Sequence, residues 1–391
     1  MFTTDKPTTV LIIGGGYAGA IAANRLRKCD DVDITVINPR PAFVERVRLH
    51  QFVAGTGTAT ADFDTLLGNG IRLVVDTATR IDADNRTVSL ASGGALDYDY
   101  LIYAVGSTGA IPSAVHGAAE FAFSAAELES AQRLQARLDT LAVDAPITVV
   151  GAGLTGIETA AELAEQGRHV TLVCGGVLAP SLSGRVRRYI AKWLTEHNVT
   201  VLENEKVAEV RSETVVLTGG AVRPSAATIW AAGFGVPQLA ANSGLSTDEV
   251  GRLLTDETLT SLDDDRIVAT GDAAAPSGQP LRMSCQATGP LGAQAADTVL
   301  SRIAGAAPAA IDLALVGSCV SLGRHAAARQ FAHKDDVAMD IYLRGGLGAA
   351  YKEFSSKLSM KKIRQEARKP GSIFWPKGGP RPQHTVTERS H

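Results

Sequence analysis

Two glycine-rich loops contain the residues whose types and spacing could do chemistry. Gly14-Gly15-Gly16-Tyr17-Ala18-Gly19 and Gly151-Ala152-Gly153-Leu154-Thr155-Gly156 both follow the pattern G-x-G-x-x-G. In such a loop the first glycine makes a tight turn, the second lets the backbone approach a pyrophosphate, and the third lets a helix pack on a strand. The start of that helix then presents free N–H groups and a partial positive charge to the phosphates. The two loops together predict two dinucleotide-binding sites.

Three further strand ends fit this plan. Thr270-Gly271-Asp272 follows an apolar run, and places an aspartate at the carboxyl edge where open sheets bind ligands. Asp272 could accept hydrogen bonds from the ribityl hydroxyls of a flavin; alternatively, it is a turn residue, since Gly-Asp often marks turns. The runs Tyr100–Gly106 and Thr228–Gly233 end in Ala-Val-Gly and Ala-Ala-Gly, a form that closes a nucleotide-binding domain.

The flanking sequence supplies the elements that must hold these loops. Apolar runs at 10–13 and 147–150 are typical of strands buried on both faces of a parallel sheet, and each precedes its loop. A helical pattern follows each loop, and strands at 32–37 and 169–173 complete two βαβ units. Further helices are predicted at 125–141, 290–303 and 347–366, and a final segment of strands begins at 317.

Length and composition agree with an α/β protein of two or three domains. The chain has 391 residues, 45% of them hydrophobic, with 39 glycines, which suits an α/β protein rich in tight turns. It has no apolar stretch long enough for a transmembrane helix and no signal peptide before the first strand, so we expect it to stay in the cytosol. Four scattered cysteines (Cys29, Cys174, Cys285 and Cys319) have no metal-ligand spacing and are expected to be reduced, mostly buried and without a metal.

The order of these motifs resembles the two-dinucleotide-fold flavoproteins related to glutathione reductase. Within that superfamily the chain is most similar to type II NADH dehydrogenases and their actinobacterial relatives, over roughly residues 10–325. The resemblance implies an α/β fold with two Rossmann-like dinucleotide-binding domains, the second inserted in the first, plus a C-terminal α+β segment. It implies an FAD-binding domain at 1–112 and 236–306, an NAD(P)-binding domain at 113–235, and a C-terminal segment at 307–391.

The resemblance also assigns roles to residues. It implies that FAD lies along the first loop and that NADH or NADPH lies along the second, with its nicotinamide stacked on the flavin. The implied FAD contacts are Gly14, Gly16, Tyr17, Ala18, Gly19, Asn38, Arg40, Ala104, Val105, Gly106, Gly271 and Asp272. The implied nicotinamide-nucleotide contacts are Gly151, Gly153, Leu154, Thr155, Gly156, Cys174 and Gly233.

Two residues are implied to be catalytic. Glu158 matches a glutamate that, in the family, lies near nicotinamide and flavin and gates charge or proton movement; the alternative is a first-turn glutamate favoured by the helix dipole. Gln286 matches the first glutamine of a motif bordering the quinone site, where Pro290 replaces the second.

The chain departs from the family at both ribose positions and in its thiols. Asn38 replaces the acid that takes the FAD adenosine ribose, although its amide can still donate and accept and Arg40 is close enough to help. Cys174 stands where an acid would indicate NADH and an arginine NADPH, so it indicates neither. The redox cysteines of the disulfide reductases are absent between residues 40 and 75, and Cys174 is expected to be too far from Cys285 or Cys319 to pair, so thiol chemistry is not expected.

The C-terminal segment is strongly basic. Residues 341–391 hold eleven Lys and Arg against three Glu, a net charge of +8 that leaves −11 on the rest of the chain. A basic tail on an acidic body indicates an acidic partner surface, with no nucleic acid expected. An apolar stripe (Leu347, Tyr351, Phe354, Leu358) could lie on the inner face of the cell membrane; we favour its docking on the body or on a second subunit of a homodimer.

These patterns predict an FAD-dependent oxidoreductase. It would take a hydride from NAD(P)H and pass electrons to a quinone-like or other small acceptor, the hydride chemistry belonging to the cofactors. Two alternatives stay open: a flavin-bound redox sensor, and a reductase that supplies electrons to a protein partner.

Overall fold

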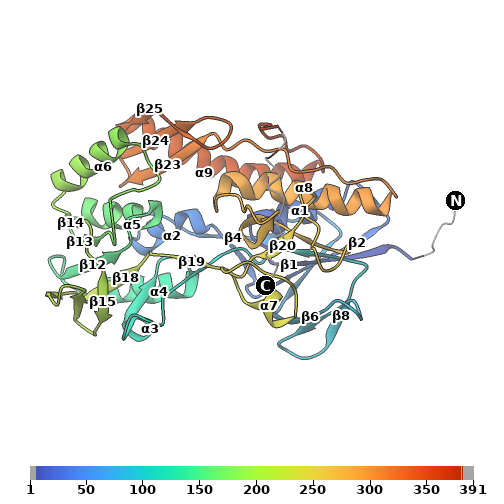
Figure 1. Ribbon diagram of the computed structural model, residues 1–391, viewed down its shortest axis with the longest axis horizontal. Helices are drawn as coiled ribbons and strands as arrows, with labels where there is room; N and C mark the ends of the chain where they lie inside the picture. The colour runs from blue at the N-terminus through green and yellow to red at the C-terminus, as the bar shows by residue number, and fades with distance from the viewer. Residues whose placement is uncertain (1–5, 380, 382–391) are drawn as a thin grey trace, which may run out of the picture.

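The computed structural model describes residues 6–379 and 381, and two parallel-sheet units lie side by side along its long axis (Figure 1). Met1–Asp5 and residues 382–391, which belong to the predicted first domain and basic tail, lie outside the described residues. The first unit has a five-stranded sheet in the order β21-β9-β1-β2-β5, and all its neighbouring strands are parallel. These strands are β1 (Thr8–Ile13), β2 (Val32–Asn38), β5 (Ile71–Val75), β9 (Tyr100–Tyr103) and β21 (Ile267–Ala269).

Small residues let two helices approach this sheet and each other closely. Helix α1 (Tyr17–Leu26) packs on α8 (Cys285–Ile303), and both are rich in alanine and glycine. A Cβ atom at Gly292 would overlap the carbonyl oxygen of Ala18, so glycine sets how closely the two helices pack. The apolar run of β1 is buried, as expected for the centre of a parallel sheet.

The second unit repeats the plan with the strand order β11-β18-β12-β13-β14, again all parallel. Its strands are β11 (Ala122–Ser124), β12 (Pro146–Val150), β13 (His169–Val173), β14 (Thr200–Leu202) and β18 (Ala227–Trp230). Its helices are α3 (Ala118–Phe121), α4 (Leu128–Thr140), α5 (Leu154–Glu165) and α6 (Gly184–Glu196), and an antiparallel sheet is formed by β15 (Val207–Val210), β16 (Thr214–Leu217) and β17 (Val222–Pro224).

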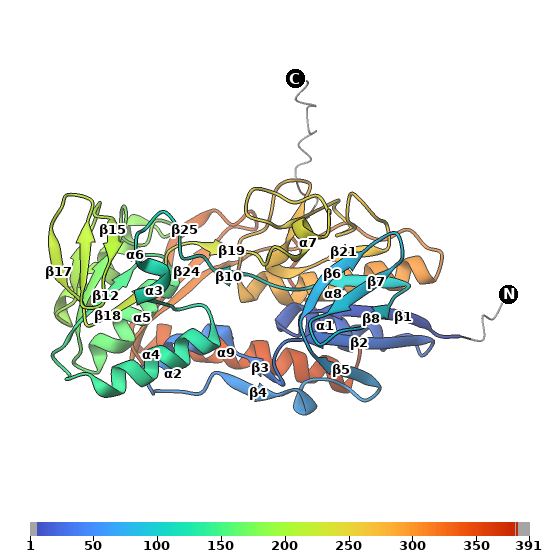
Figure 2. The same ribbon diagram turned by 90° about the horizontal axis from the view of Figure 1, so that it is seen from below.

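The chain enters and leaves the second unit through a narrow ribbon. Strands β10 (Thr108–Gly109) and β19 (Phe234–Gly235) pair antiparallel between the two units (Figure 2). The second unit is therefore inserted between β9 and β21 of the first, which confirms the predicted fold class.

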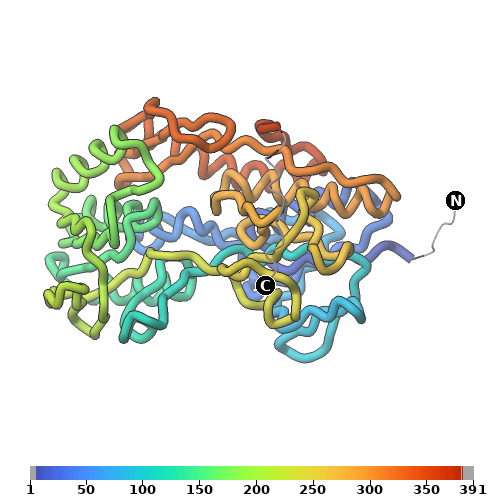
Figure 3. Tube along the Cα trace, viewed as in Figure 1, coloured from blue at the N-terminus to red at the C-terminus, as the bar shows by residue number. Residues whose placement is uncertain are grey.

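The C-terminal segment covers both units on one side (Figure 3). It consists of an antiparallel sheet followed by a long helix, which is the predicted α+β segment. These elements are β23 (Gly317–Leu322), β24 (Ala326–Ala332), β25 (Ala338–Arg344) and α9 (Gly345–Arg368). Within the described residues no helix is long and apolar enough to cross a membrane.

Short elements complete the first unit. They are β3 (Ala42–Val44), α2 (Leu49–Val53), β4 (Thr60–Asp62), β6 (Ala78–Asp82), β7 (Thr87–Leu90), β8 (Ala95–Asp97), α7 (Leu239–Asn242), β20 (Leu253–Thr255), β22 (Ala274–Pro276) and the 3-10 turns Arg46–Arg48, Phe63–Thr65 and Gly271–Ala273.

Helix α9 docks on the body, but the predicted apolar stripe is wrong at two of its four residues, since Tyr351 and Leu358 are half-buried and Leu347 and Phe354 are exposed. Its buried positions are Gly348, Ser356, Met360, Ile363 and Glu366, and Met360 and Ile363 join a cluster that includes residues of α1. Leu347 and Phe354 are instead 74% and 60% exposed. The stripe was misplaced because β24 and α1 select which face of the helix is covered, and no local pattern encodes that choice.

Candidate functional site

In the first glycine loop, each of the three motif positions is a glycine for a different physical reason. Gly14 has φ +104° and lies against the backbone of Ala104, so a side chain there would be both strained and obstructed. A Cβ atom at Gly19 would overlap the carbonyl oxygen of Gly14. A Cβ atom at Gly16 would meet nothing within 4 Å, so this glycine opens on free space just before α1 begins.

The second loop repeats these three features. Gly151 has φ +110°, and a Cβ atom there would lie 2.8 Å from the amide nitrogen of Ala232. A Cβ atom at Gly156 would overlap the carbonyl oxygen of Gly151, whereas one at Gly153 would meet nothing within 4 Å. Each loop therefore has two glycines required by packing and a middle glycine that leaves room for a pyrophosphate.

A cavity of about 1000 Å³ begins at the first loop and reaches the second. It brings together most of the residues predicted for FAD and both predicted catalytic residues. Its lining includes Gly14, Gly16, Tyr17, Ala18, Asn38, Arg40, Ala104, Val105, Gly106, Leu154, Thr155, Glu158, Gly271, Asp272 and Gln286. Six predicted residues do not line it: Gly19, Gly151, Gly153, Gly156, Cys174 and Gly233.

Polar side chains on the cavity wall differ in whether a ligand in the cavity can reach them. The Tyr17 hydroxyl and the Thr270 hydroxyl are buried and have no hydrogen-bond partner. Ser107 donates to the carboxylate of Asp272 at 2.7 Å, and Arg46 donates to the Ser107 carbonyl oxygen at 2.6 Å. These two hydroxyls expose almost no surface to the cavity, so the group on this wall that fits a polar ligand such as FAD is the Asp272 carboxylate, which has acceptor capacity for further donors.

At the adenosine end, the two predicted residues are held by the protein itself. The Asn38 side chain accepts from the Gly15 amide at 2.9 Å and donates to the Arg40 carbonyl at 2.7 Å. The Arg40 guanidinium pairs with both carboxylate oxygens of Glu129, one of them at 2.7 Å, and lies 3.7 Å from Glu127. Asn38 therefore fixes the glycine loop, and Arg40 ties the first unit to helix α4.

Glu158 forms a buried ion pair with a lysine from the C-terminal helix. It is the fifth residue of α5, beyond the first turn, so a helix-dipole role does not describe it. The Lys352 ammonium donates to Glu158 Oε1 at 2.6 Å, and the Ser321 amide donates to the same oxygen at 3.0 Å. Burial opposes both charges, but their mutual attraction is stronger, so the pKa of Lys352 is raised and that of Glu158 is lowered. Both groups are therefore charged at neutral pH.

His50 stands beside this pair in its neutral form. Its Nε2 lies 3.2 Å from the Ser321 hydroxyl and its Nδ1 lies 3.9 Å from Glu158. Burial lowers the pKa of His50 to about 4, against the attraction of Glu158, and the Lys352 charge lowers it further.

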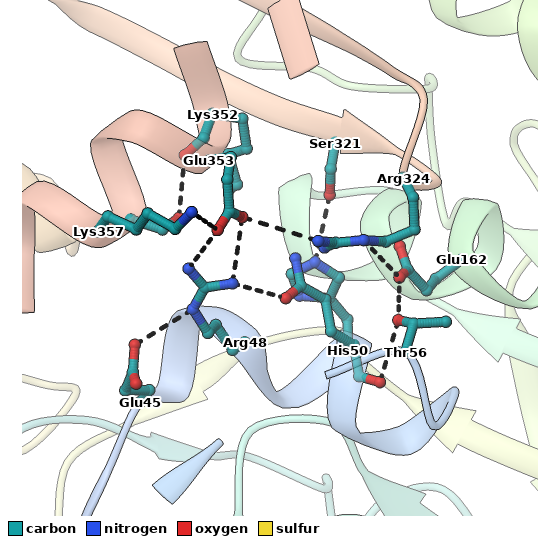
Figure 4. Close-up of polar contacts among 12 residues, drawn as sticks. Glu45, Arg48, His50, Thr56, Glu162, Ser321, Arg324, Lys352, Glu353 and Lys357 are labelled. Atoms are coloured by element: carbon teal, nitrogen blue, oxygen red, sulfur yellow. Dashed lines mark hydrogen bonds and ion pairs between the residues drawn. The ribbon is translucent and has the colours of Figure 1, made fainter. Parts of the chain in front are cut away.

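A second group of charges anchors α9 next to Lys352 (Figure 4). Arg48 donates to both carboxylate oxygens of Glu353, at 3.1 and 3.2 Å, and Arg324 lies 3.8 Å from the same carboxylate. Arg324 also lies 4.0 Å from Glu162, which is 1% exposed and accepts a hydrogen bond from Thr56. Because Glu353 follows Lys352 directly, this network fixes the direction in which Lys352 enters the cavity.

Gln286 and two cysteines complete the wall. Gln286 Oε1 accepts from the Val316 amide at 3.2 Å, which joins the start of α8 to the C-terminal segment. Cys285 and Cys319 both line the cavity. The expectation of mostly buried cysteines is wrong: Cys285 is exposed and the other three are half-buried, because these positions border cavities and loop ends. Burial raises the pKa of Cys319 to about 11, so it is a thiol at neutral pH.

Sequence reasoning missed Lys352, His50 and Ser321. Lys352 was visible only as one charge of a basic helix, and it meets Glu158 across 194 residues of chain. The partner of this lysine can be recognised only once the helix is docked.

Two glycine loops on two parallel sheets, opening on one shared cavity, define a two-dinucleotide α/β oxidoreductase. Residues 8–297 match the family described as pyridine nucleotide-disulphide oxidoreductase. The chain belongs to this family of enzymes, which use FAD together with NADH or NADPH.

Relatives within the family have related names and align with this chain over most of their length. A NADH dehydrogenase-like protein of Mycobacterium tuberculosis is 31% identical over 326 residues, which cover 75% of this chain and 80% of that protein. A type II NADH:quinone oxidoreductase of Staphylococcus haemolyticus is 26% identical over 405 residues, covering 88% and 98%. The structure of NDH2 from Plasmodium falciparum in complex with NADH superposes with a TM-score of 0.78 at 15% identity, covering 93% and 97%. This last likeness shows the fold alone.

Proposed function

We propose that this chain is an FAD-dependent enzyme that oxidises NADH or NADPH and reduces a quinone-like acceptor. The observation that carries the proposal is the buried Lys352–Glu158 pair, which lies on the wall of the shared cavity at the start of α5. Names of relatives support the acceptor class, since several are type II NADH:quinone oxidoreductases.

The residues present fit both nucleotides. The open space at Gly16 and the start of α1 would receive the FAD pyrophosphate, and those at Gly153 and α5 would receive the nicotinamide nucleotide. The Asp272 carboxylate would accept hydrogen bonds from ribityl hydroxyls, in company with the Ser107 hydroxyl that already donates to it. When bound, FAD supplies the two-electron chemistry between nicotinamide and acceptor.

The protein's own contribution at this point is electrostatic. Reduction of a quinone by NADH consumes one proton beyond the transferred hydride. Lys352 Nζ holds a proton on the cavity wall, and Glu158 Oε1 holds that ammonium in place at 2.6 Å. His50, which also lines the cavity, is neutral and hydrogen-bonds with the Ser321 hydroxyl, so the imidazole adds no charge that competes with the Lys352 cation.

Anaerobic stopped-flow spectroscopy tests the proposal. The holoenzyme is mixed with NADH or NADPH, and the reduced protein is then mixed with a menaquinone analogue, oxygen or ferricyanide. We expect nucleotide to bleach the flavin and the quinone to reoxidise it much faster than oxygen does. A flavin that stays reduced for minutes with quinone and air would favour the redox sensor, and a flavin that neither nucleotide bleaches would refute the mechanism.

We also propose that the outer face of α9 contacts an anionic membrane. Its exposed positions recur at helical spacing, apolar at the beginning of the helix and basic afterwards: Leu347, Ala350, Phe354, Lys357, Lys361, Arg364 and Arg368. Exposed Leu and Phe beside a row of cations are typical of helices that lie in a membrane interface. This face is separate from the one that docks on the body, so both contacts can exist together.

A further inference from the structure

The adenosine end of the second nucleotide site lacks its expected acid at Cys174. In this fold a carboxylate after the second strand accepts the hydroxyls of the adenosine ribose. Here that strand is β13, it ends at Val173, and a thiol follows. A thiol is a weak hydrogen-bond donor and acceptor, so Cys174 cannot do the work of a carboxylate.

The neighbouring strand brings a carboxylate to the same edge. Strand β14 pairs parallel with β13, and Val173 is opposite Leu202 in the register. The next residue of each strand is therefore Cys174 on one side and Glu203 on the other. The carboxyl ends of parallel strands meet at one edge of the sheet, which is where nucleotides bind.

Hydrogen bonds fix this carboxylate in the loop that follows β13. The Cys174 amide donates to the Leu202 carbonyl at 2.9 Å, and the Asn204 amide donates to the Gly176 carbonyl at 2.8 Å. The Leu178 amide donates to Glu203 Oε1 at 2.6 Å. Besides burial, the negative charge of Glu203 raises the pKa of the Cys174 thiol, to about 12. The charge of the Glu203 carboxylate is therefore felt at Cys174, the position that the ribose-binding acid normally occupies.

The surroundings suit a hydroxyl and not a phosphate. Within the described part of the chain, no basic side chain forms an ion pair with Glu203. The loop at 175–180 contains no arginine or lysine, which a 2′-phosphate would need.

We infer that Glu203 accepts the adenosine ribose hydroxyls of the nicotinamide nucleotide and makes this enzyme specific for NADH over NADPH. One carboxylate oxygen already holds the loop through Leu178, and a carboxylate has acceptor capacity for more than one donor. A 2′-phosphate would bring two negative charges against this group without a cation to offset them. The inference rests on the proposed role of the second glycine loop as the NAD(P)H site.

The test compares the variant E203Q with wild type and with the control E205Q. Glu205 lies in the same loop, and only its backbone carbonyl is engaged there, by the Gly175 amide. Gln at 203 keeps the size and an oxygen for the Leu178 amide, so the loop is expected to keep its shape. Calorimetry measures the Kd of the holoenzyme for NAD⁺ and NADP⁺, and anaerobic flavin reduction gives the preference between NADH and NADPH.

We expect wild type and E205Q to bind NAD⁺ more tightly than NADP⁺, and E203Q to lose roughly tenfold or more of that ratio, as for the loss of a hydrogen bond to a charged group. A ratio in E203Q equal to that of wild type, with NAD⁺ still bound, would overturn the inference alone. A wild type that prefers NADP⁺ would also overturn it. If wild type bound neither NAD⁺ nor NADP⁺, the proposed function and this inference would be overturned together.

Discussion

The buried Lys352–Glu158 pair gives the sharpest prediction about how α9 is attached. The variant K352M keeps most of the side-chain volume but leaves the Glu158 carboxylate buried, with the Ser321 amide as its remaining hydrogen-bond donor. Removing one partner of a buried ion pair costs about 3–5 kcal/mol, because the other charge is left without compensation. We therefore expect the free energy of unfolding of K352M to fall by about that amount at pH 8.

A double-mutant cycle separates this pairing from loss of packing. In K352M/E158Q no charge is left uncompensated, so we expect the double variant to be more stable than K352M, with a coupling energy of about 1–3 kcal/mol. The control is K357M on the same helix, since Lys357 is 72% exposed and pairs with Glu353 at 3.3 Å. Its loss should stay below about 1 kcal/mol.

Urea titrations followed by tryptophan fluorescence at pH 8 and pH 5 measure these differences. Without Lys352, burial raises the pKa of Glu158, so the folded variant takes up a proton as the pH falls. A group whose folded pKa is raised stabilises the folded state on the acid side, so the deficit of K352M should shrink at pH 5. Losses in the two single variants that simply add in the double variant would refute the reasoning.

Three further predictions follow from other buried positions and from α9. Burial lowers the pKa of His50 from 6.5 to about 4, so as the pH falls His50 is protonated in the unfolded chain before it is protonated in the folded protein. The free energy of unfolding should therefore fall by about 3 kcal/mol between pH 6.5 and pH 4. H50Q should lack this loss in urea titrations at several pH values. G19A should fail to give a folded holoenzyme by circular dichroism and flavin absorbance, because a Cβ atom at Gly19 would overlap the Gly14 carbonyl oxygen. G16A should fold and lose FAD affinity, because Gly16, unlike Gly19, faces open space; retention of FAD by G16A would contradict this. F354S should sediment with phosphatidylglycerol vesicles several-fold less than wild type at low salt, and should reduce ferricyanide at the wild-type rate. If F354S and wild type bound the vesicles equally, that result would argue against membrane contact.

Much of the fold could be predicted from the sequence because its signals are local. A buried parallel strand is an apolar run, and a nucleotide loop is a spacing of glycines just before a helix, so both can be recognised within about twenty residues of chain. Gly14 and Gly151 are glycine because their φ angles are positive, and Gly19 and Gly156 because a helix must touch the loop. These requirements do not depend on the rest of the molecule.

The polar detail of the site depended on packing between distant segments. Lys352 reaches Glu158 only because α9 docks through Met360 and Ile363, a face that its own helical pattern did not reveal. Local periodicity reports which residues a helix could bury, and the neighbouring elements decide which it does.

The sequence by itself determined two glycine loops, two parallel sheets and the cofactor class, because turn geometry and strand burial depend on residues that are close together in the chain. Only the tertiary structure brought Glu203 beside Cys174 and Lys352 beside Glu158. Charges act through space, so their partners are set by the edge at which strands end and by the helix that covers them.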